Sequence, residues 1–154
     1  MPSAIRRAAA TVALAGLFVV PVVAQKVNTS FTGLAIDGYD PVAYFTLSKP
    51  VKGSRQFTFE FGGATYRFAS AEHREQFAKD PAKYVPQYGG FCAYGIGLGK
   101  KLDGDPLMWN IVDNKLYFNT NADVNTEWQK DKSGNIKKAE MNWGKVKDKR
   151  QNEL

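Results

Sequence analysis

The sequence has very few of the side chains that build soft-metal and redox sites. Its 154 residues include one cysteine, Cys92, and one histidine, His73. A single cysteine excludes an intramolecular disulfide, a Cys-x-x-Cys redox pair and a zinc site made only of thiolates. A single histidine excludes a relay of several imidazoles. Any soft-metal or thiol chemistry must therefore depend on these two side chains.

The sequence also lacks an apolar run as long as the roughly 20 residues that a membrane-spanning helix requires. Its most apolar stretch, Ala8 to Val23, follows two arginines and ends in the small-residue pattern Val22-Val23-Ala24. A basic start, a short apolar centre and small residues before a cut are typical of a signal peptide. We expect residues 1–24 to be removed and the mature protein to be periplasmic or secreted, without stable membrane insertion.

The excess of basic residues is small once that segment is removed. The mature chain keeps 19 basic and 15 acidic residues, so its net charge is +4. This charge is too mild for a nucleic-acid-binding protein. The mature chain also keeps 19 aromatic residues, enough for a packed interior. With no internal repeat, this length predicts a single domain.

Two β-hairpins are predicted from the alternation of apolar and polar side chains. Residues 56–68 form two alternating segments joined by a Gly-Gly pair, as half-buried strands do. Residues 109–118 form two further segments around Asp113-Asn114, a pair that tolerates the positive φ of a two-residue turn. Antiparallel pairing is therefore expected at both places.

Helices are predicted where a capping residue precedes a segment of mixed polarity. The Ser70 hydroxyl can accept from first-turn amides, which predicts a helix over Ala71–Lys79. A further helix should begin after Thr120 or Asn121 and end at Gly134. Together these elements predict an α+β fold, with short helices packed on a small antiparallel sheet.

Several motifs resemble the YHS domain family. They are Gly38-Tyr-Asp-Pro-Val-Ala-Tyr-Phe45, Tyr66-Arg-Phe68 followed by His73 and Phe77, Tyr88-Gly-Gly-Phe-Cys-Ala93, and the hairpin from Trp109 to Tyr117. They are similar to the exported branch of this family. The resemblance implies an N-terminal lead over residues 25–33, a YHS-like domain over residues 34–143 and a basic tail over residues 144–154.

The metal-linked members of the family carry three cysteines in these motifs. Carried over by position, those cysteines fall on Ala43, Ala69 and His73, so this chain has a thiol at none of the three. Only His73 keeps a metal-ligating side chain at one of these positions.

His73 and Cys92 are the first candidates for a ligand site. Copper-like soft metals bind imidazole, thiolate and thioether groups, so Met108 can join them and Asp40 can supply an oxygen. A closed zinc site is less expected, because carboxylates or water would have to fill two positions. In the plainer alternative, His73 faces water at a helix start and Cys92 is a small buried apolar side chain.

The aromatic residues near the motifs form a second group of candidates. Most are expected in the core, but Tyr39, Tyr88, Phe91 and Trp109 can line a pocket for an apolar or planar ligand. We therefore expect an exported, non-enzymatic protein of the cell envelope that binds a soft metal such as copper, or a small molecule. Two alternatives stay open: a thiol-dependent enzyme or redox protein centred on Cys92, and an interaction module that uses the aromatic surface or the basic tail.

Overall fold

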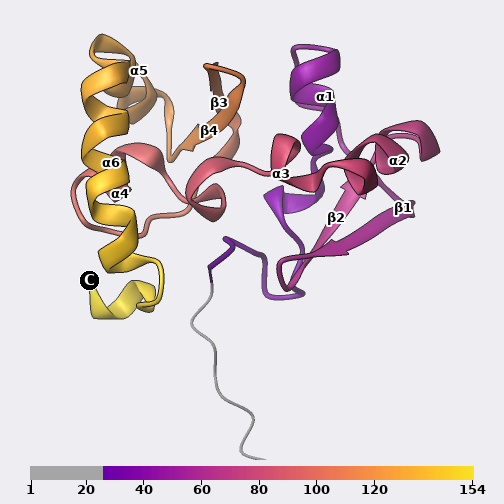
Figure 1. Cartoon of the computed structure of the whole chain (residues 1–154), viewed down its shortest axis with the longest axis horizontal. Coiled ribbons are helices and arrows are strands. Elements are labelled where there is room, and N and C mark those ends of the chain that lie inside the picture. The colour runs from indigo at the N-terminus through magenta and orange to yellow at the C-terminus, as the bar shows by residue number, and fades with distance from the viewer. Residues whose placement is uncertain (1–25) are drawn as a thin grey trace, which may run out of the picture.

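The computed structural model describes residues 26–154 (Figure 1). The expected signal peptide, residues 1–24, lies outside the described residues. In chain order the elements are η1 (Ile36–Gly38), α1 (Pro41–Thr46), β1 (Ser54–Phe61), β2 (Ala64–Phe68), α2 (Ala71–Lys79), α3 (Pro81–Tyr84), η2 (Gln87–Gly90), α4 (Ala93–Gly97), β3 (Asp105–Val112), β4 (Lys115–Asn119), α5 (Ala122–Lys130), α6 (Lys132–Val146) and η3 (Gln151–Glu153).

The expected α+β fold is confirmed. The strands form two separate antiparallel pairs, β1 with β2 and β3 with β4, with short helices packed around them. Both hairpins and the α2 helix lie where the sequence predicts them. Within residues 26–154, no helix is long and apolar enough to span a membrane.

One half of the molecule is built on the β1–β2 hairpin. β2 turns Tyr66 and Phe68 to its buried face, as its alternation predicts. α2 begins at Ser70, whose hydroxyl accepts from the His73 amide, and buries Phe77 on this face. The Phe77 ring contacts the rings of Phe59, Phe61, Tyr66, Phe68 and Tyr84. Truncation of such a central aromatic side chain costs about 3–5 kcal/mol.

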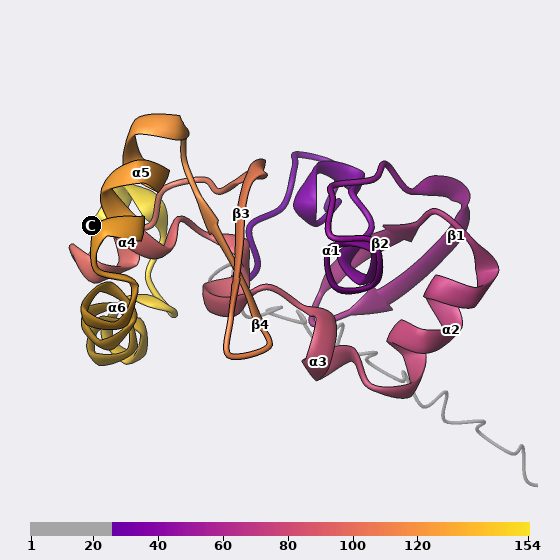
Figure 2. The same ribbon diagram turned by 90° about the horizontal axis from the view of Figure 1, so that it is seen from above.

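The β3–β4 hairpin stands between the two halves of the molecule (Figure 2). Its turn residues Asp113 and Asn114 have φ values of 49° and 58°, as a type I′ turn requires. Leu116 and Phe118 join the hydrophobic cluster of the first half, whereas Tyr117 joins that of the second. Because successive strand residues point to opposite faces, this one hairpin supplies both cores.

The second half consists of α4, α5 and α6, packed on the Tyr117 face of the hairpin. The buried Trp128 ring lies 5.6 Å from the Tyr117 ring, measured between centroids. Lys101 is also buried, and its ammonium donates to the carbonyl oxygens of Lys147 and Lys149 at 2.7 and 2.6 Å. Desolvation lowers the pKa of Lys101. This cation stabilises the carboxyl end of α6, where helix carbonyls lack partners.

The last helical region differs from the sequence-based prediction at Gly134. α5 begins as expected at Asn121, whose side chain accepts from the Val124 amide. However, α5 already ends at Lys130, because the Asp131 side chain caps a new helix and accepts from the Gly134 amide at 2.9 Å. Gly134 therefore lies in the first turn of α6. A side chain there would collide with the capping carboxylate, which explains the glycine.

Candidate functional site

The one histidine of the chain is held by a buried carboxylate. His73 lies in the first turn of α2, and its Nδ1 is 2.6 Å from Oδ2 of Asp40. The Asp40 side chain is fully buried, whereas the His73 side chain keeps 14% of its surface exposed. The structure therefore brings together two of the four metal-ligand candidates that the sequence offered.

The Asp40 carboxylate uses both oxygens for hydrogen bonds within the protein. Oδ1 caps α1 by accepting from the amides of Val42 and Ala43, at 2.8 and 3.3 Å. Oδ2 accepts from the Ala69 amide at 2.8 Å as well as from His73. A carboxylate offers about four acceptor directions, so these four partners fill them. Asp40 thus orients His73 and has no lone pair left for a metal ion.

The ring orientation leaves the second nitrogen of His73 as an acceptor. Because Asp40 accepts at Nδ1, that nitrogen carries a proton, and in the neutral imidazole Nε2 then presents its lone pair. Nε2 lies 3.5 Å from the Thr46 hydroxyl at the end of α1. This hydroxyl is also 3.1 Å from the carbonyl oxygen of Val42, so its one proton serves either acceptor. His73 is therefore a fixed ligand or acceptor nitrogen close to the surface.

A groove opens beside Thr46. It has a volume of about 490 Å³ and lies between the end of α1, α3 and the β3–β4 hairpin, which are side by side in both views (Figures 1 and 2). The groove is lined by Tyr44, Phe45, Thr46, Ser48, Lys83, Tyr84, Trp109, Ile111 and Asn114. The Tyr44 hydroxyl donates to the Pro106 carbonyl oxygen at 2.9 Å and so ties α1 to β3. Burial raises the pKa of Tyr44.

Cys92 is enclosed in the protein and has partners of its own. Its Sγ lies 3.6 Å from Oδ1 of Asn119 and accepts from the Gly95 amide at 3.4 Å, as the cap of α4. Cys92 and Asn119 are both fully buried. Within the part of the chain that the structure describes, no three His, Cys, Asp or Glu side chains are placed to hold one metal ion. The structure thus gives Cys92 and His73 separate hydrogen-bond partners.

The remaining candidates are spread over both halves. Trp109 lines the groove and contacts Tyr44 with a centroid distance of 5.5 Å. Tyr39 lies under a lysine ammonium 3.9 Å from its ring centre. Tyr88 and Phe91 belong to the hydrophobic cluster of the second half, and Met108 is half-buried on β3. Of the four aromatic candidates, Trp109 is therefore the one that lines the groove beside His73.

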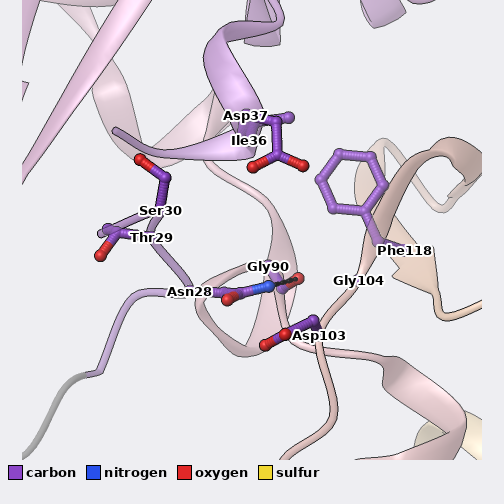
Figure 3. A pocket seen from close by; sticks show the side chains of 9 residues that line it. All are labelled: Asn28, Thr29, Ser30, Ile36, Asp37, Gly90, Asp103, Gly104 and Phe118. Atoms are coloured by element: carbon purple, nitrogen blue, oxygen red, sulfur yellow. Dashed lines mark hydrogen bonds between the residues drawn. The ribbon is translucent and has the colours of Figure 1, made fainter. Parts of the chain in front are cut away.

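A smaller, polar cavity of about 140 Å³ lies where the two halves meet (Figure 3). Its lining residues are Asn28, Thr29, Ser30, Ile36, Asp37, Gly90, Asp103, Gly104 and Phe118. The Asp103 carboxylate already accepts from the Gln151 side chain at 2.9 Å. At roughly 30 Å³ per water molecule, the cavity suits a few waters. The groove offers more apolar surface and more room, so we place the candidate site there.

The sequence did not identify the residues around the open nitrogen of His73. Thr46 and Asn114 look like ordinary helix-end and turn residues, and Lys83 is one lysine among many. One local signal could have indicated α1, because Asp40 before Pro41 is a good helix start as well as a good turn. It does not show that the end of α1 meets α3 and β3, which are about 40 and 60 residues away.

Comparison of the chain with protein-family models, with curated proteins and with solved structures found no match. The resemblance to the YHS family therefore rests on the residues of the motifs themselves and stays a prediction.

Proposed function

We propose that this chain is an exported, non-enzymatic binding module of the YHS type, which holds a small molecule in the groove between α1, α3 and β3. The observation that carries the proposal is a groove lined by aromatic side chains, in which the hydroxyl of the lining residue Thr46 lies 3.5 Å from Nε2 of His73. Asp40 holds the His73 ring in this orientation. The groove volume of about 490 Å³ falls within the roughly 300–1,000 Å³ of small-molecule sites. Small-molecule sites combine aromatic side chains with polar groups that fix the orientation of the ligand, and this lining contains both.

The surroundings of Asp40 support the YHS part of the proposal. The three positions that the resemblance aligns with cysteines are Ala43, Ala69 and His73, and each has a hydrogen bond to this one carboxylate. Positions separated by about 30 residues in the sequence therefore meet at one point. In this chain, two alanine methyl groups and an imidazole occupy the positions where relatives are expected to carry thiols.

The burial of Cys92 favours binding over thiol chemistry. A nucleophilic or redox thiol needs access and a stabilised thiolate. Cys92 is fully buried, and its Sγ is occupied by the Asn119 side chain and the Gly95 amide. Among the described residues it has no hydrogen bond to His73, the only imidazole that could act as its base.

Nuclear magnetic resonance of the ¹⁵N-labelled mature protein tests the groove directly. We expect a library of small aromatic fragments to shift the amide signals around Thr46, Lys83 and Trp109. Thr46→Trp should fill the groove and abolish these shifts. Thr126→Trp is a matched control, because Thr126 is also exposed, and its hydroxyl bonds the carbonyl four residues back, as Thr46 does. Equal binding to both variants would place the site elsewhere and contradict the proposal.

A soft metal such as copper is the second candidate ligand, favoured by the carboxylate bond to His73. Metal-bound histidines usually donate their other ring N–H to such a carboxylate, which fixes the ligating nitrogen. In this second proposal, Nε2 of His73 is the protein ligand, because Nδ1 faces Asp40. Titration of the reduced protein with Cu(I) against a chelator should then weaken on His73→Ala and stay unchanged on Cys92→Ser. Loss of Cu(I) binding in both variants would restore the two-ligand site expected from the sequence.

A further inference from the structure

We infer that the ligand of the groove is a planar organic anion, such as an aromatic carboxylate, with its charge on Lys83. This inference rests on the proposed binding function of the groove and adds the chemical class of its ligand. It is carried by the aromatic walls and by the sign of the charge among the lining residues.

The walls of the groove suit a flat apolar ligand. Phe45 and Tyr84 meet edge to face, with ring centroids 5.5 Å apart and planes at 85°. Across the groove, Trp109 is braced by Tyr44 at 5.5 Å, and Ile111 continues the apolar surface. Aromatic side chains offer ring faces and edges that bind another ring in stacked or T-shaped geometry. Because α1 and β3 are tied together by the Tyr44–Pro106 hydrogen bond, these walls are pre-positioned.

The charge of the lining residues sets the sign of the ligand charge. Lys83 is the one ionisable cation of the lining, and no lining residue is an aspartate or glutamate. The Lys83 ammonium lies 5.1 Å from the centre of the Tyr84 ring. Among the described residues it forms no ion pair. A carboxylate in the groove would thus meet a cation already placed beside an aromatic wall, and no acidic side chain among the residues that line the groove.

Neutral donors around the rim complete the recognition of an anion. Ser48 and Asn114 line the groove and carry a hydroxyl and an amide, both able to donate to carboxylate oxygens. Charge-assisted hydrogen bonds of this kind are about twice as strong as neutral ones. An organic cation of the same shape would face the Lys83 ammonium, and repulsion between these two positive charges would weaken its binding. The groove therefore discriminates by charge as well as by shape.

Three probes of one shape test the ligand class: 1-naphthoate, 1-naphthylmethanol and 1-naphthylmethylammonium. Each is titrated into the mature protein, and the affinity is taken from the amide shifts of groove residues. We expect 1-naphthoate to bind about tenfold more tightly than the alcohol, and the ammonium more weakly than either. Lys83→Gln should weaken naphthoate about three- to tenfold and leave the alcohol unchanged. Lys137→Gln, an exposed lysine of α6, is the matched control and should change neither affinity.

The outcomes separate this inference from the proposed function. If no probe shifts the groove signals, both are overturned. If the alcohol or the ammonium binds the groove as tightly as naphthoate, the binding function stands and the anion class is wrong. If naphthoate binds but Lys83→Gln and Lys137→Gln weaken it equally, the effect is that of net charge, and the role of Lys83 is wrong. Raising the salt concentration should reduce the naphthoate preference and leave the alcohol unaffected.

Discussion

Replacing Asp40 by asparagine removes one charge from the interior while nearly preserving shape. In the native protein the carboxylate accepts from the amides of Val42, Ala43 and Ala69 and from Nδ1 of His73. An asparagine has one acceptor oxygen and one donor nitrogen. Its amide can cap α1 or accept from Ala69 and His73, but it cannot do both. Asp40→Asn therefore leaves buried donors without an acceptor.

The size of this effect follows from the bonds that are lost. If the amide oxygen stays on the cap of α1, the charge-assisted bond to His73 disappears, worth about 1.5–3 kcal/mol. The Ala69 amide, whose hydrogen bond to Asp40 is only partly buried, then faces a donor, which costs about 1 kcal/mol. If the amide turns round, the loss of the cap costs about 0.5–2 kcal/mol instead. We expect Asp40→Asn to lower the free energy of unfolding by about 2–5 kcal/mol and the melting temperature by about 10–20 °C.

Urea denaturation followed by circular dichroism measures the stability, with Asp37→Asn as the control. Asp37 is exposed, and among the described residues its carboxylate has no hydrogen bond, so its loss should change stability by less than about 0.5 kcal/mol. The position of the proton on the His73 ring is measured by ¹⁵N spectroscopy, at a pH above the range in which histidine ordinarily titrates. The chain has one histidine, so its two ring nitrogens are easily assigned. The wild type should carry its proton on Nδ1. A loss of less than 1 kcal/mol in Asp40→Asn, or a proton on Nε2 in the wild type, would refute the account of this pair.

Four further predictions concern how closely parts of the protein are packed. Because Cys92 is fully buried, a thiol reagent should modify it only after unfolding in urea; modification within seconds in buffer would contradict its enclosure. Gly104→Ala should destabilise by more than about 2 kcal/mol, because the new Cβ would overlap the Gly90 carbonyl oxygen. Gly144→Ala has open space around the new Cβ, so it should stabilise α6 by about 0.5–1 kcal/mol. Equal melting temperatures for the Gly104→Ala and Gly144→Ala variants would contradict the close packing at Gly104. Burial raises the pKa of Tyr66 from 10.0 to about 12. The unfolded chain loses this proton first, so Tyr66 alone should lower stability by about 2 kcal/mol from pH 10 to 12. Tyr44, Tyr88 and Tyr117, whose pKa values burial also raises, should add to this loss, and tyrosinate absorbance should lag in the folded protein.

Local patterns in the sequence were enough for both hairpins, for α2 and for the start of α5. The helix over Ala71–Lys79 has the Ser70 cap that the sequence predicts, and the Asp113-Asn114 turn has the two positive φ values that its residue types favour. Such features depend on hydrogen bonds and torsion angles within a few residues. The one wrong boundary, at Gly134, arose because glycine there accommodates a capping side chain at the start of a helix, whereas glycine more often ends one.

The candidate site followed from the sequence only in part. Scarcity singled out His73 and Cys92, and turn chemistry singled out Asp40. Their grouping depended on contacts between residues far apart: Asp40 reaches His73 across 33 residues, while Cys92 bonds Asn119 across 27. No local period or cap determines such pairs, so spacing alone does not decide whether His73 and Cys92 meet.

The amino-acid sequence by itself determined the class of the fold, the two hairpins and the first turn of α2. The tertiary structure alone decided which side chains meet. Docking of the β3–β4 hairpin between the two halves places Trp109 and Asn114 beside Thr46 and Lys83. The groove exists because one face of this hairpin must be buried against α1 and α3, and that requirement comes from the closing of a hydrophobic core around residues distant in sequence.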